Sequence, residues 1–324
     1  MSEIKEVYLN NFRIFKERKF YFKDGINIIY GGNGKGKTTL LEAIYYLNFG
    51  KSFRTKRIWD LARGESFSAV IKIYEGSDFL MEAVFEKGKV RKLLDGKRVK
   101  FSEILDLFFV IFVNSERIFS FFKERREKRR LFDSFAAGID NLYINYLLNY
   151  NKTLKNKSLL LRRGERNRTV YEGWSEQVDF YGLKIRERRE ELLKEINEML
   201  LNEGIEIKVE PAERRYGLEE EIRRKRVLNG PHLDNFIIRE KDKNIFIYGS
   251  KGIWKKVYFK IIESYIEIFM KKKGKKPVLL IDDFDSDLDG INLIESIKTF
   301  KTQTFLTFVT ESFKSIKNYN LVEV

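Results

Sequence analysis

The sequence predicts an α/β fold that is interrupted by a mainly helical insertion. A glycine-rich loop at 31–38 lies between a predicted strand and a predicted helix. A buried-type strand at 278–281 ends in two aspartates, and helical periodicity fills residues 120–201 between these two features. Because roughly 240 residues separate the loop from the aspartates, a compact single phosphate-binding domain is excluded, and the helical stretch is interpreted as an insertion.

Composition narrows the chemistry that the chain can perform. The sequence holds 63 Lys and Arg against 48 Asp and Glu, a formal net charge of +15, which suits a polyanionic partner such as nucleic acid. A basic solvated surface is the alternative. The absence of cysteine and the single histidine exclude disulfides, thiolate metal sites and histidine-cluster metal sites. Carboxylates, backbone amides and cationic side chains must therefore carry the chemistry.

The hydropathy pattern argues against a membrane protein. No charged leader followed by an apolar run opens the sequence, and no stretch approaches roughly 18 uninterrupted apolar residues. We therefore expect a cytoplasmic location and no membrane association.

The predicted elements follow an order of strands, helices and strands. The glycine-rich loop is followed by a helix that ends near Gly50, and the pair Asp95-Gly96 predicts a hairpin turn. Strands are expected at 4–9, 20–22, 26–30, within 67–113, and at 205–209, 236–238, 245–247, 278–281 and 304–309, with a short helix between the last two. The predicted division is an ATP-binding lobe of residues 1–119 and 202–324 and an inserted helical lobe of residues 120–201.

The loop at 31–38, which we call the phosphate loop, fits the pattern G-x-x-x-x-G-K-[ST]. Its glycines let successive backbone N–H groups point at phosphates, and the helix N-terminus adds a partial positive charge. Lys37 is expected to neutralise the β and γ phosphates of ATP, and Thr38 to hold Mg²⁺. The predicted nucleotide-binding residues are Gly31, Gly32, Asn33, Gly34, Lys35, Gly36, Lys37, Thr38 and Thr39.

The strand at 278–281 predicts the second half of the same site. Buried strands rarely end in paired carboxylates without a metal or phosphate nearby, and Asp282 suits the Mg²⁺ shell. Asp283 is expected to polarise the attacking water, so the candidate catalytic residues are Asp283 and Lys37. Surface acids at a strand end are the alternative reading.

Two further segments place these motifs in a larger pattern. Gly249-Ser250-Lys251-Gly252, which we call the signature segment, starts a predicted helix about thirty residues before Asp282, and Ser286-Asp287-Leu288-Asp289 follows Asp283. This order is typical of an ABC-type P-loop ATPase head with an inserted mainly helical lobe. In a head-to-tail dimer, Ser250 and Gly252 of one copy would bind the γ-phosphate held by the other. An ordinary helix start is the alternative for Ser250 and Gly252.

Several further stretches complete the pattern. They are Leu9-Asn10-Asn11-Phe12-Arg13-Ile14-Phe15, the phosphate loop and its helix, Gly50-Lys51-Ser52-Phe53-Arg54-Thr55, Asp95-Gly96-Lys97, Lys128-Arg129-Arg130-Leu131-Phe132-Asp133, Gly230-Pro231-His232-Leu233-Asp234 and Asp282-Asp283-Phe284-Asp285-Ser286-Asp287-Leu288-Asp289. On these stretches the chain resembles the RecF family over most of its length. The resemblance implies ATP-dependent homodimerisation, weak ATPase activity, binding to double-stranded or gapped DNA, and cooperation with RecR and RecO in loading RecA onto single strands.

Several basic residues are candidates for contact with phosphates, although exposed arginines are usually only solvated. Arg13 is expected to reach the nucleotide. The candidates for the DNA backbone are Arg54, Lys56, Arg57, Arg129 and Arg130. His232, the single histidine, is interpreted as structural.

The chain also departs from the family pattern. Ile253-Trp254 follow the signature segment where the family usually has two glutamines, and Val113-Asn114-Ser115-Glu116-Arg117-Ile118 lacks the family's proline. A diverged ABC-type ATPase that serves a protein or membrane partner rather than DNA therefore remains the alternative function.

Overall fold

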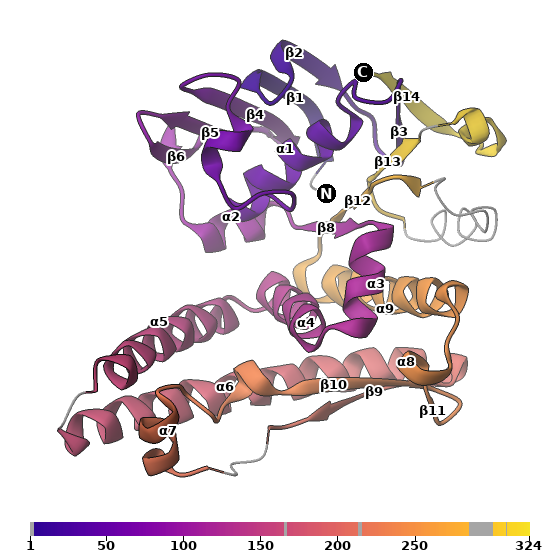
Figure 1. Cartoon of the computed structure of the whole chain (residues 1–324). Helices are drawn as coiled ribbons and strands as arrows, with labels where there is room; N and C mark the ends of the chain where they lie inside the picture. Colours follow the sequence, from indigo (N-terminus) through magenta and orange to yellow (C-terminus); the bar gives the residue numbers. More distant parts are fainter. Residues whose placement is uncertain (1–2, 165–166, 213–215, 285–300, 309) are drawn as a thin grey trace. The chain divides into compact units, whose positions relative to one another are not determined.

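The computed structural model describes residues 3–164, 167–212, 216–284, 301–308 and 310–324, and the chain forms two compact units (Figure 1). The first unit combines residues 1–117 with residues 269–324, and the second spans residues 118–268. Two segments far apart in the sequence thus build the first unit, as an inserted lobe requires.

A six-stranded antiparallel sheet forms one layer of the first unit. Its strand order is β2-β1-β4-β5-β6-β7. Asp95 and Gly96 both have positive φ (49° and 75°) between β6 and β7, so the predicted hairpin turn is confirmed. The strands are β1 (Glu3–Phe12), β2 (Phe15–Tyr21), β4 (Phe67–Tyr74), β5 (Asp78–Glu86), β6 (Lys89–Leu94) and β7 (Lys97–Arg98).

A five-stranded parallel sheet forms the other layer of this unit. Its strand order is β14-β3-β13-β12-β8, and every neighbouring pair runs parallel. The predicted buried strands at 278–281 and 304–309 correspond to β12 and β13, which are buried along their whole length. The members are β3 (Ile26–Tyr30), β8 (Val110–Val113), β12 (Val278–Ile281), β13 (Thr304–Phe308) and β14 (Tyr319–Glu323).

Helix α1 (Lys37–Phe49) lies between these two sheets. Its side chains are buried almost throughout and share one hydrophobic core with both layers. At its end, the amide of Asn48 donates to the carbonyl of Phe108 (2.7 Å) and accepts from the N–H of Val110 (3.2 Å), which fixes α1 to β8. The short helices η1 (Ile58–Leu61), α2 (Phe101–Leu107) and η5 (Glu311–Ser315) complete this unit.

The second unit is mainly helical, with one small antiparallel sheet. Its long helices α5 and α6 pack along each other, and α6 buries an apolar stripe of Val178, Ile185, Leu192, Ile196 and Leu200. The helices are α4 (Arg125–Ile139), α5 (Asn141–Arg163), α6 (Arg168–Leu200), η2 (Leu201–Glu203), α7 (Leu218–Arg224), η3 (Pro231–Leu233) and α8 (Ile245–Tyr248); the strands are β9 (Ile205–Glu210), β10 (Asn235–Glu240) and β11 (Lys243–Asn244).

Helices α3 (Ser115–Lys123) and α9 (Lys251–Lys273) each run from one unit into the other. None of the helices in the described part of the chain has the length and apolar character that crossing a bilayer needs.

The structure differs from the sequence-based elements at several places, and β14 is a strand that the sequence-based elements did not include. Residues 245–247 form the helical turn α8 rather than a strand, because the Asn244 side chain accepts from the N–H of Phe246 and caps a turn. The second unit also extends to residue 268 rather than 201, because β9 packs on α6 and β10 on α4. The helix expected between β12 and β13 and the segment 286–289 lie outside the described residues.

Candidate nucleotide-binding site

The phosphate loop connects the end of β3 to the start of α1. Gly36 has φ 115°, and a Cβ at this position would lie 2.3 Å from the Phe15 ring, so both conformation and space require glycine. Gly34 also has positive φ, at 76°. Gly31, next to β3, is buried, whereas the following residues Gly32, Asn33, Gly34 and Lys35 are exposed. The loop therefore presents an open stretch of backbone at the N-terminus of a buried helix, as phosphate binding requires.

Lys37 is the first residue of α1 and is buried, with 6% of its surface exposed. Its Nζ donates to the carbonyl oxygens of Gly31 (2.7 Å) and Gly32 (3.3 Å). The ammonium group is thus held across the loop, within reach of any anion bound there. Thr39, the third predicted member of this helix start, is buried in the core.

Thr38 and Asp282 meet at the edge of the parallel sheet. The Thr38 hydroxyl donates to Oδ1 of Asp282 (3.1 Å), and the Thr307 hydroxyl at the end of β13 donates to the same oxygen (2.7 Å). Carboxylate and hydroxyl oxygens are donors that Mg²⁺ prefers. The two predicted metal ligands, 244 positions apart in the sequence, are therefore brought together with suitable chemistry.

The environment of Asp282 shifts its acidity in opposing ways. Burial raises the pKa of Asp282, and the charge of Asp283 raises it further. The hydrogen bonds from Thr307 and Thr38 and the positive charge of Arg54 oppose this rise. Burial outweighs them, so a cation at this position would stabilise the carboxylate.

Asp283 combines an exposed side chain with a constrained backbone. Its φ is 51°, in the left-handed region, and its N–H donates to the Thr307 hydroxyl (2.7 Å). This conformation costs a residue with a side chain about 1 kcal/mol or more, although aspartate tolerates it better than most residues. The side chain is thereby turned away from the buried path of β12 and is accessible to solvent.

Glu42 is a residue of this site that the sequence reasoning missed. Its carboxylate is fully buried on α1 and accepts from Arg13 Nε (2.9 Å) and Nη2 (2.7 Å), from Arg54 Nη1 (3.4 Å) and from the Ser52 hydroxyl (2.5 Å). The only signal in the sequence was a charged residue within the apolar stripe of a helix. Arg13 is thus fixed to α1 by a bidentate ion pair, and its expected contact with the nucleotide stays a prediction.

The signature segment belongs to the second unit. Ser250 immediately precedes α9, and its hydroxyl accepts weakly from the N–H of Ile253 (3.4 Å). Ser250 and Gly252 are both exposed, so the predicted helix start is confirmed and its N-terminal amides face solvent. A contact of this segment with a second copy stays a prediction.

The candidate DNA-binding residues divide between the units. In the first unit, Lys56 and Arg57 are exposed, and Arg54 forms an ion pair with Glu42. In the second unit, Arg129 donates to the carbonyl of Asp234 (2.6 Å), and Arg130 pairs with Glu127. Their role on DNA stays a prediction.

His232 lies in a buried polar network of the second unit. Its Nδ1 is 2.6 Å from the Tyr150 hydroxyl, and burial lowers the pKa of His232 to about 4. Next to it, the fully buried Asp234 carboxylate accepts two hydrogen bonds from Arg186 (2.9 and 2.6 Å). This geometry supports a structural role for the histidine.

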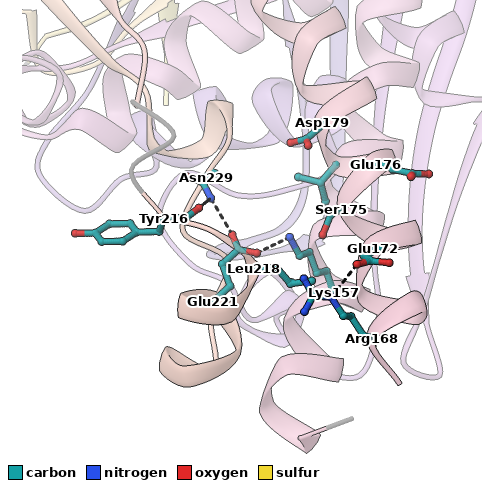
Figure 2. Close-up of a pocket in the computed structure, with 11 residues that line it drawn as sticks. Lys157, Arg168, Glu172, Ser175, Glu176, Asp179, Tyr216, Leu218, Glu221 and Asn229 are labelled. Atoms are coloured by element: carbon teal, nitrogen blue, oxygen red, sulfur yellow. Dashed lines mark hydrogen bonds and ion pairs between the residues drawn. The ribbon is translucent and has the colours of Figure 1, made fainter. Parts of the chain in front are cut away.

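A pocket of about 240 Å³ also opens in the second unit (Figure 2). Its lining includes two cationic side chains and four acidic ones, and Lys157 and Glu221 form an ion pair at 2.5 Å. The excess of acids would repel a triphosphate. The lining residues are Lys157, Arg168, Glu172, Ser175, Glu176, Val178, Asp179, Tyr216, Leu218, Glu221 and Asn229.

Comparisons with known proteins agree with this geometry. A family model described as an AAA domain matches residues 6–304. The chain is 31% identical to the DNA replication and repair protein RecF of Thermoanaerobacter pseudethanolicus, with 96% of this chain and 95% of that protein covered. It is 33% identical to the RecF of Carboxydothermus hydrogenoformans over 98% of this chain and 97% of that protein.

A solved structure of the recombination mediator protein RecF with an ATP analogue, described as part of the RecFOR pathway, superposes with a TM-score of 0.86. It is 26% identical, and the match covers 99% of this chain and 98% of that one. The Smc head domain of Pyrococcus furiosus shares the fold, at a TM-score of 0.52 and 18% identity over 96% of this chain and 90% of that one. The predicted ABC-type head is thereby confirmed, and the chain belongs to the RecF family of DNA replication and repair proteins.

Proposed function

We propose that this chain is an ATP-dependent DNA-binding protein of recombinational repair, in which ATP controls the association of two copies. The observation that carries the proposal is the hydrogen bond of 3.1 Å between Thr38 and Asp282, because it joins the phosphate loop to the carboxylate strand in one site. Family membership supplies the repair context. A location in the cytoplasm is part of the same proposal.

ATP would occupy the phosphate loop. The backbone amides from Gly31 to Thr39 and the ammonium of Lys37 are the groups that fit its phosphates. Thr38 and Asp282 would hold Mg²⁺, which neutralises phosphate charge when it is bound. Arg13 lies in the turn between β1 and β2 and is held by Glu42 of α1. From this turn it would bind the same phosphates.

Hydrolysis would be slow and would serve as a switch. The exposed carboxylate of Asp283 is the group proposed to orient and polarise a water, since it follows the metal-binding aspartate directly. Lys37 would stabilise the charge that develops on the phosphates.

A homodimer would form when ATP is bound. Ser250 and Gly252 stand at the exposed N-terminus of a 23-residue helix, whose amides and partial positive charge suit the γ-phosphate of a second copy. Hydrolysis would remove that phosphate and release the contact.

The closed dimer would bind double-stranded or gapped DNA through its basic residues and help to load a recombinase onto single strands. A net charge of +15 supports largely sequence-independent, salt-sensitive affinity. Arg54, Lys56, Arg57, Arg129 and Arg130 are the proposed contacts. RecR-like and RecO-like mediators are the proposed protein partners, because a relative is described as part of the RecFOR pathway.

Fluorescence anisotropy of labelled gapped duplex DNA tests this function. The protein would be titrated with a non-hydrolysable ATP analogue, with ADP and without nucleotide, and Lys37→Ala is the matched control. Tight binding only with the analogue, lost in the control and weakened by salt, is expected. No DNA binding in any state would instead favour the alternative, a diverged ABC-type ATPase that serves a protein or membrane partner.

A further inference from the structure

Trp254 follows the signature segment by two residues and packs against it. The residue lies in the first turn of α9 and is 7% exposed. Its indole N–H donates to the carbonyl of Ile245 at 2.9 Å, and the N–H of Gly249 donates to the same oxygen at 2.8 Å. The indole therefore ties α9 to α8 across the loop that begins the signature segment.

The backbone of Gly249 lies directly against this indole ring. A Cβ at Gly249 would be 2.5 Å from the Ile245 oxygen and 2.8 Å from both Cδ1 and Nε1 of Trp254. Gly249 has φ −83°, an ordinary value for any residue, so glycine is needed here for space rather than for conformation. The path of the loop into Ser250 is consequently determined by the tryptophan.

Three aromatic rings, those of Phe119, Phe122 and Phe246, pack around the Trp254 ring. Phe122 stacks on it with centroids 5.3 Å apart and planes 22° apart, and Phe119 and Phe246 lie at 5.8 and 6.5 Å. Such pairs stabilise a defined ring orientation beyond the area that they bury. The ring is thus held by contacts with α3, α8 and Gly249 of the signature segment.

We propose that Trp254 is a positioning residue that holds the signature segment in the geometry needed to bind the phosphate carried by a second copy of this chain. The inference rests on the proposed ATP-dependent dimer. The exposed Ser250, Lys251 and Gly252 would otherwise lose conformational freedom on binding, which weakens association. A loop held by the indole has already lost that freedom.

Two substitutions separate positioning from folding. Trp254→Phe keeps a ring for Phe122 but removes the indole N–H, and Trp254→Ala removes both. Trp174→Phe, on α6, is the matched control. For each variant, sedimentation velocity would give the dimer dissociation constant with a non-hydrolysable ATP analogue, and a fluorescent ATP analogue would give the nucleotide affinity of the dilute monomer.

Trp254→Phe is expected to weaken dimerisation by about tenfold, and Trp254→Ala on the order of a hundredfold. Nucleotide affinity should stay within about twofold in both variants, because the phosphate loop belongs to the other unit. ATP hydrolysis should recover when the protein concentration is raised, a response that a misfolded variant would not give.

Wild-type dimer affinity in both Trp254 variants would overturn the inference and leave the proposed function intact. If Trp254→Ala fails to fold, Trp254→Phe alone decides, by the same criterion. A wild-type chain that stays monomeric with the analogue would overturn the proposed function itself, and this inference with it.

Discussion

At the scale of single residues, Lys37 and Asp283 lie in different environments, which suits the different roles proposed for them in binding and in turnover. Lys37 is buried and bonded to two loop carbonyls, whereas Asp283 is exposed at the end of a strand. A buried ammonium can bind an anion that enters the loop, and an exposed carboxylate can accept a hydrogen bond from a water molecule and polarise it. Substitutions at these two residues should therefore produce different defects.

Replacement of the lysine should affect binding first. Lys37→Ala removes the positive charge from the loop, and we expect the affinity for a fluorescent ATP analogue to fall by at least tenfold, about 1.4 kcal/mol. Lys89→Ala, at an exposed position on β6 of the same unit, is the control and should change affinity by much less. Equal affinities in the wild type and Lys37→Ala would mean that the nucleotide is bound elsewhere.

Replacement of the second aspartate should affect turnover alone. Asp283→Asn keeps the size of the side chain but removes the proposed base, so ATP affinity should stay within about twofold while hydrolysis slows by roughly 10²-fold or more. The ATP-bound dimer should accumulate as a result. Steady-state phosphate release measures this, and an unchanged rate would assign water activation to another group.

The histidine gives a prediction about pH. Burial lowers the pKa of His232 from 6.5 to about 4, so the unfolded chain takes up this proton first as the pH falls. Stability from this group is therefore full above pH 6.5 and falls as the pH drops toward 4. Because the chain has one histidine, its imidazole resonances in NMR spectra are unambiguous. They should not titrate between pH 5.5 and 8, and a midpoint near 6.5 would contradict the buried geometry.

At the scale of elements, α5 and α7 are joined by an ion pair that is almost fully removed from water. The Lys157 and Glu221 side chains are 5% and 3% exposed, and the second oxygen of Glu221 accepts from the N–H of Leu228 (2.8 Å). A buried pair adds little net stability, but loss of one partner leaves an uncompensated charge. This contact makes the packing of α7 on α5 specific.

The ion pair leads to a prediction about stability. Lys157→Met should lower the free energy of unfolding by about 3–5 kcal/mol in urea titrations. The double variant Lys157→Met with Glu221→Gln should recover part of that loss, and Lys155→Met, an exposed position on the same helix, should stay within about 0.5 kcal/mol of wild type. An additive double variant would show that the two residues do not interact.

Elements whose evidence is local were predictable from the sequence. The strand, loop and helix around the phosphate loop follow from glycine positions and hydrophobic periodicity, and the contact of Thr38 with Asp282 follows from parallel strands ending at one edge. Residues 245–247 were misread because a short apolar run does not distinguish a strand from a helical turn. The ion pair of Glu42 with Arg13 and the stacking of Trp254 on Phe122 were not foreseen, because each joins segments distant in the sequence, which no local pattern reveals.

At the scale of the whole molecule, the chain is one ATPase head whose parts are distributed over two units. The phosphate loop and the carboxylate strand lie in the first unit, and the signature segment lies in the second. α3 and α9 each contribute residues to both units. We propose that the bound nucleotide controls the association of two such heads.

Sedimentation velocity of the wild-type chain with a non-hydrolysable ATP analogue, with ADP and without nucleotide tests that claim most directly. We predict a dimer with the analogue, a monomer in the other two states, and a monomer in every state for Lys37→Ala. A wild-type chain whose association state is the same under all three conditions would contradict the account.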